Sequence, residues 1–114
     1  MEPIMVLLII TIAAMLLDVF TGIAKALKHG NLDSSKMREG LWHKSGFIGL
    51  LALAELLQIA SQYADLGFEV PALSLVCLFV IMTEAVSVIE NLSDLNPAIA
   101  NSPLGKLLEN NKGE

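Results

Sequence analysis

The sequence predicts an all-α membrane protein with three transmembrane helices. Three observations predict it: 54% of the 114 residues are hydrophobic, only 17% are charged, and the apolar residues come in long blocks. Ordinary soluble domains carry roughly 25% charged residues. The alternative is a soluble three-helix bundle, but its helices need a continuous polar face, which these blocks lack.

Each of the three apolar blocks is long enough to cross a bilayer as a helix. An α-helix rises about 1.5 Å per residue, and the hydrocarbon core of a membrane is about 30 Å thick. The first block lacks the basic start of a cleavable signal peptide and runs past its usual length. We therefore expect spans at about residues 4–27, 45–64 and 70–89.

Short polar segments separate the predicted spans. Residues 28–44 join the first span to the second, and residues 65–71 join the second to the third. Pro71 suits the first turn of the third helix, where its missing N–H is not needed. The chain then divides into a transmembrane domain, 1–92, and a polar tail, 93–114.

The distribution of basic residues predicts the orientation of the chain. All seven Lys and Arg residues lie within 25–44 or in the tail, whereas the N-terminus and residues 65–71 carry only acidic charges. Since basic segments stay in the cytoplasm, we expect the N-terminus outside and the C-terminus inside. Trp42 and Tyr63 bracket the second span, as interfacial aromatic anchors do.

The composition argues against several classes of function. A net charge of −5 gives no reason to expect a nucleic-acid partner. Cys77 is the single cysteine, so neither an intrachain disulfide nor a thiolate metal site is expected. No Gly-rich phosphate loop, zinc-ligand spacing or Ser/His/Asp arrangement occurs, which predicts no enzyme, no cofactor and no metal. His29 and His43 flank a basic segment and are expected to be solvated.

Each predicted span carries a polar stripe with one carboxylate deep in the apolar block. A charge at the bilayer centre costs about 2.5–3.5 kcal/mol on insertion scales, so these residues should face the bundle interior or water. They either line a wet space or only join helices to one another. The candidate polar-face and oligomerisation residues are Asp18, Thr21, Gly22, Lys25, Glu55, Gln58, Gln62, Glu84, Ser87, Glu90 and Asn91.

Two motifs follow one another along the chain. The first is DVFTGIAKALKHGNLDSSKMREGLWHK (18–44), and the second is TEAVSVIENLSDLNP (83–97). The first combines an Asp-x-x-Thr-Gly element with a polar segment, and the second contains Glu-x-x-Ser-x-x-Glu-Asn. Their defining positions are Asp18, Thr21, Gly22, Ser34, Ser35, Lys36, Gly40 and Lys44, then Glu84, Ser87, Glu90 and Asn91.

In this order the motifs resemble those of bacteriophage holins, a family that also includes toxin-secretion holins. The resemblance covers most of residues 18–108. It implies a multi-pass protein of the bacterial cytoplasmic membrane that oligomerises with itself in the lipid bilayer. It also implies lesions through which an endolysin escapes to lyse the host cell, without required contact between the two proteins. An antiholin is a further partner that the resemblance suggests.

The residues alone leave two other functions open. The deep carboxylates would suit an ion or proton path in a small channel or transporter subunit. A regulatory membrane protein of the antiholin type would bind a partner and form no hole. Release of a cytosolic enzyme after induction separates the holin from both alternatives.

Overall fold

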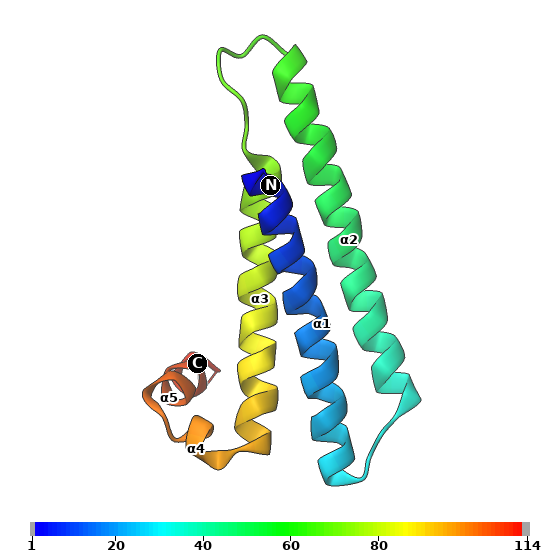
Figure 1. Ribbon diagram of the computed structural model, residues 1–114, viewed down its shortest axis with the longest axis vertical. Helices are drawn as coiled ribbons and strands as arrows, with labels where there is room; N and C mark the ends of the chain where they lie inside the picture. The colour runs from blue at the N-terminus through cyan, green and yellow to red at the C-terminus, as the bar shows by residue number, and fades with distance from the viewer. Residues whose placement is uncertain (1, 113–114) are drawn as a thin grey trace.

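The computed structural model describes residues 2–112, and throughout this range the regular structure is helical without strands. Figure 1 shows the long helices running along one axis and the short C-terminal helices at one end. The three long helices are each long and apolar enough to cross a membrane, as the sequence predicts. The helices are α1 (Pro3–His29), α2 (Ser34–Tyr63), α3 (Ala72–Leu95), α4 (Pro97–Ala100) and α5 (Pro103–Lys112).

The chain turns sharply between α1 and α2. Gly30 has φ 68°, a left-handed conformation that glycine adopts without strain. Its N–H donates to the Leu27 carbonyl, and the Asn31 N–H donates to the Ala26 carbonyl, which together form the Schellman motif. The Asp33 side chain then accepts a 2.8 Å hydrogen bond from the Ser35 N–H and caps α2. Two helix ends therefore meet across a very short connection.

This connection is shorter than the polar composition of residues 28–44 predicts. The helix α2 begins at Ser34, so residues 34–44 form its first turns rather than a loop. The segment contains Lys36, Arg38 and Glu39, which are good helix formers. Its polar composition marks the end of an apolar block and not the end of a helix.

The boundaries of α3 also differ from the prediction. Pro71 lies at the N-cap position, one residue before the helix, rather than in its first turn. The helix continues to Leu95, so it crosses the expected boundary between residues 92 and 93. The predicted tail also forms α4 and α5, which pack closely together. A Cβ at Gly105 would lie 2.5 Å from the carbonyl oxygens of both Ile99 and Ala100.

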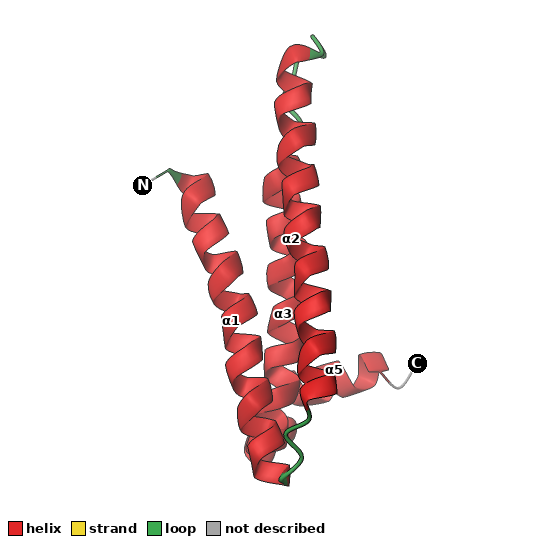
Figure 2. Ribbon diagram, turned by 90° about the vertical axis from the view of Figure 1, so that its right-hand side faces the viewer, coloured by secondary structure: helices red, strands yellow, loops and turns green. Residues whose placement is uncertain are grey.

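The helix α3 contacts both of the other long helices. One apolar cluster joins Leu51 and Ala54 of α2 to Leu73 and Cys77 of α3. Cys77 is fully buried there, as a small core side chain. A second cluster brings together one residue from each long helix, namely Met15, Phe47 and Val80. Figure 2 shows that α1 is inclined to α2 and α3.

Most other apolar side chains of the long helices point outward. Phe20 of α1, Leu56 of α2 and Met82 of α3 are each more than 60% exposed. Such surfaces suit contact with lipid tails, which are as apolar as the side chains themselves. Trp42 and Tyr63, the expected aromatic anchors, are also strongly exposed.

Candidate functional site

A lysine joins two carboxylates where the three long helices meet. The Lys44 Nζ atom of α2 lies 2.7 Å from Asp18 Oδ2 of α1 and 2.8 Å from Glu84 Oε2 of α3. The side chain of Glu84 is 1% exposed, that of Lys44 12% and that of Asp18 20%. Charges on three different helices are thus paired in a largely enclosed place.

Asn91 extends this group from the next turns of α3. Its Nδ2 atom donates to Asp18 Oδ1 and to Thr21 Oγ1, each at 3.0 Å. The Thr21 hydroxyl itself donates to the Leu17 carbonyl at 2.8 Å. Gly22 lies beside it, and a Cβ there would be 3.7 Å from Asn91 Nδ2, an ordinary van der Waals contact. We call Asp18, Thr21, Lys44, Glu84 and Asn91 the polar cluster.

The polar cluster satisfies its own hydrogen bonds. Within the described part of the chain, no buried side-chain nitrogen or oxygen lacks a partner. Removing water from a charge costs several kcal/mol, and attraction between well-placed partners offsets that penalty. The three ionisable groups therefore depend on one another, and Lys44 is the member that pairs with both others.

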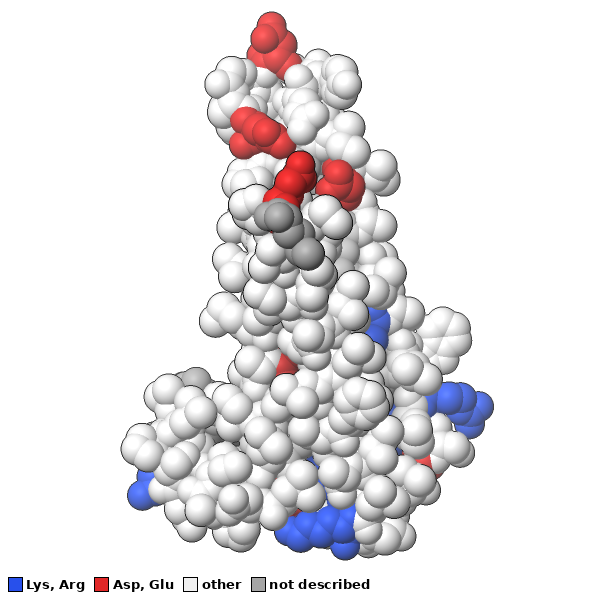
Figure 3. Space-filling view, in the orientation of Figure 1, with Lys and Arg blue, Asp and Glu red and all other residues white. Residues whose placement is uncertain are grey.

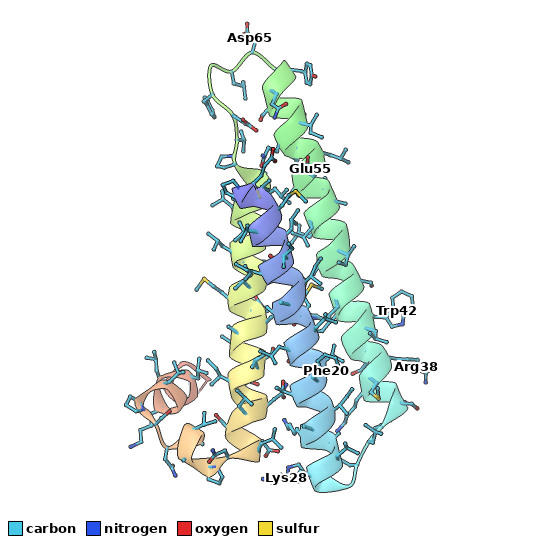
Figure 4. All side chains as sticks on the ribbon, in the orientation of Figure 1. Phe20, Lys28, Arg38, Trp42, Glu55 and Asp65 are labelled. Carbon is cyan, nitrogen blue, oxygen red and sulfur yellow. The ribbon has the colours of Figure 1, made fainter. Side chains whose placement is uncertain are left out.

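The polar residues predicted for the second span lie elsewhere. Gln58 Oε1 accepts a 3.0 Å hydrogen bond from the Leu73 N–H at the start of α3. Gln62 Nε2 donates to Glu69 Oε1 at 2.9 Å, within the same end of the molecule. These amides hold the connection between α2 and α3. Glu55 lies on an exposed face of α2 (Figure 4).

The remaining candidates lie at the opposite end, near α4 and α5. Lys25 is exposed and Glu90 is half-buried, and both line a cavity that also includes Gly105 of α5. Ser87 is half-buried on α3. At the ends of the helices, His29 Nε2 contacts Asp94 Oδ2, so this histidine ties α1 to α3 on the surface.

Lys44 is the cluster member that the polar-stripe reasoning missed. The sequence places it in the polar segment before a span that begins at residue 45, among the charges that predict the orientation and as the last position of the first motif. With α2 beginning at Ser34, Lys44 lies three turns inside the helix. The feature of the sequence that could have identified it is the first motif, which begins at Asp18 and ends at Lys44.

The basic residues gather at one end of the molecule, whereas acidic residues occur at both ends. Figure 3 shows acidic side chains without basic ones near the N-terminus and the α2–α3 connection, and basic side chains toward the opposite end. The exposed acidic residues near the N-terminus and this connection are Glu2, Glu55, Asp65 and Glu69, and the exposed basic residues toward the opposite end are Lys25, Lys28, Lys36 and Arg38.

Comparison with known proteins identifies a family. The profile of the bacteriophage holin family matches residues 2–110, nearly the whole chain, which confirms the resemblance carried by the two motifs. It is a family of membrane proteins without enzymatic activity. No curated protein and no solved structure matches the chain significantly.

Proposed function

We propose that this chain, which belongs to the bacteriophage holin family, oligomerises in the cytoplasmic membrane of a bacterial host and opens lesions. An endolysin then escapes through these lesions and lyses the cell. The observation that carries the proposal is the family match over residues 2–110, in a chain with three helices able to span a membrane. The three helices by themselves support a multi-pass membrane protein, and the family match is what supports endolysin release and lysis.

The segregation of charge supports one orientation in that membrane. Basic residues are retained on the cytoplasmic side, so the α1–α2 connection, α4 and α5 lie in the cytoplasm. The N-terminus and the α2–α3 connection, which carry acidic residues, then lie outside (Figure 3). Trp42 lies near the cytoplasmic boundary and Tyr63 near the outer one.

The polar cluster supports a change between two arrangements of the helices. In a single chain its charges are paired inside and the outer surfaces are apolar, which suits a chain dispersed in lipid. A lesion needs polar surface toward water. Rotation of the helices within a large assembly would expose Asp18, Lys44 and Glu84, and hydration would then replace their ion pairs. The polar cluster thus supplies polar side chains that are buried in the single chain and face water in the assembly.

Inducible expression in bacteria tests the proposal. The chain should cause abrupt lysis when an endolysin without its own export signal is co-expressed, and the endolysin alone should cause none. Loss of membrane potential without release of the enzyme would instead identify an ion channel. Failure to lyse, together with delayed lysis by another holin, would identify a regulatory antiholin. Either outcome contradicts the proposal.

A further inference from the structure

A cavity of about 370 Å³ separates α1 from α2 at the basic end of the molecule. The Asp18–Lys44 ion pair lines one end of it, and the connection that includes Asn31 and Asp33 lines the other. Between these limits, the C-terminal half of α1 faces the first turns of α2. The cavity lies in the part of the chain that carries most of its exposed lysines.

The walls of this cavity combine apolar side chains with charged ones. The cations are Lys25 of α1 and Lys36 of α2, beside the paired Lys44. The carboxylates are Asp18, which pairs with Lys44, and Asp33, which caps α2. On α2, residues 36, 40 and 44 are spaced by four and so share one helix face. The apolar lining residues are Val19, Ile23, Ala26, Leu32, Met37 and Leu41.

We propose that this cavity binds one anionic phospholipid of the surrounding membrane. The headgroup phosphate binds Lys25 and Lys36, and an acyl chain packs against the apolar walls between α1 and α2. Basic pockets between helices on the cytoplasmic side are suited to anionic headgroups. This proposal goes beyond lesion formation, because the bound lipid belongs to the single chain before any assembly.

The lining of the cavity favours a lipid over a helix from a second copy. Cations and apolar side chains line the same cavity, which suits an anionic headgroup joined to an acyl chain. An acyl chain is also much narrower than a helix, which is about 10 Å wide with its side chains. It can enter from the lipid that surrounds the two helices.

Not every cation at this end belongs to the site. Arg38 follows Lys36 by two residues, but it does not line the cavity, and Figure 4 shows it pointing away from α1. Lys106 on α5 is exposed and does not line the cavity either. These two residues therefore provide a charge-matched control for the two lysines of the site.

Native mass spectrometry of the delipidated full chain in detergent tests the charge requirement. With dioleoyl phosphatidylglycerol and dioleoyl phosphatidylcholine at equal concentration, the wild type should bind one phosphatidylglycerol in preference. The Lys25→Gln/Lys36→Gln variant should lose roughly 30-fold in affinity for it. Arg38→Gln/Lys106→Gln removes the same charge and should keep the preference. An equal loss of phosphatidylglycerol affinity in both variants would mean that the lipid is attracted to any basic surface, and it would overturn the proposal.

Two glycine variants test the cavity itself. A Cβ at Gly40 or at Gly46 meets no atom within 4 Å, so each α2 position accepts a larger side chain. Gly40 lines the cavity and Gly46 does not. Gly40→Leu should therefore lower phosphatidylglycerol binding by about tenfold or more, whereas Gly46→Leu should leave it unchanged. Helix content by circular dichroism should match in the two variants.

Two further outcomes would overturn the proposal. Inorganic phosphate in excess should not displace the lipid; if it does so fully, the cavity binds a free anion rather than a phospholipid. If Gly40→Leu removes dimers from the spectrum while lipid binding persists, the cavity is an interface between copies of the chain.

Discussion

Lys44 Nζ lies 2.8 Å from Glu84 Oε2, although 40 residues separate the two in the chain. Glu84 is 1% exposed and is the largest of the fully buried side chains among the described residues. An unpaired carboxylate there would face an apolar interior and a strong desolvation penalty. Lys44 supplies the opposite charge, and because the same Nζ also binds Asp18, one side chain forms ion pairs with groups on two helices.

Replacement of Lys44 should therefore destabilise the protein more than replacement of any exposed lysine. Lys44→Met leaves Asp18 and Glu84 facing each other without a cation, at a cost of about 3–5 kcal/mol. Lys44→Arg keeps the charge and should be milder. Thermal unfolding in detergent and the amount of full-length protein in membranes measure the effect. Arg38→Met, at an exposed position on the same helix outside the cavity, is the control; equal stability of the two methionine variants would contradict this account.

Asn91 should contribute to the contact between α1 and α3. Asn91→Ala removes the donor to Asp18 Oδ1 and Thr21 Oγ1, and such a loss at a buried acceptor costs about 1–3 kcal/mol. The melting temperature in detergent should fall accordingly. Asn101→Ala, at an exposed position after α4, should leave it unchanged. A melting temperature equal to the wild type for Asn91→Ala would show that α3 holds α1 by apolar packing alone.

The helices were predictable because long apolar blocks leave few alternatives for a backbone that must satisfy its hydrogen bonds. The start of α2 was not predictable in this way, since lysine, arginine and glutamate are polar and yet favour helix. Sequence spacing placed Asp18, Thr21 and Gly22 on one face and Glu84 near Asn91. It could not give the rotation of α2 about its axis, which packing against α3 determines. For this reason Lys44, and not Glu55, supplies the contact from α2.

Cysteine labelling tests the orientation, which stays a prediction. Cys77 is the single cysteine of the sequence, so Cys77→Ala provides a background without thiols. In intact cells, a membrane-impermeant maleimide should modify Glu2→Cys and Leu66→Cys from outside. Lys36→Cys and Lys106→Cys should react only after the membrane is permeabilised. Labelling of Lys106→Cys in intact cells would place the C-terminal helices outside and reverse the proposed topology.

Asp18 should matter for lysis more than for insertion. Asp18→Leu removes a charge that is expensive in the bilayer, and Glu84 still neutralises Lys44, so the variant should accumulate in membranes. It loses a polar group that we propose turns toward water, so lysis with a co-expressed endolysin should be late or absent. Asp18→Asn keeps a polar side chain beside Asn91 and should be milder.

The optical density of induced cultures gives the lysis time, and immunoblots of membranes give the amount of protein. Glu84→Leu should likewise delay lysis more than Glu84→Gln, because Glu84 and Asp18 both pair with Lys44. If Asp18 only joins helices, Asp18→Leu should also reduce the oligomers seen after crosslinking. Normal accumulation together with an unchanged lysis time would show that this carboxylate takes no part in opening the membrane.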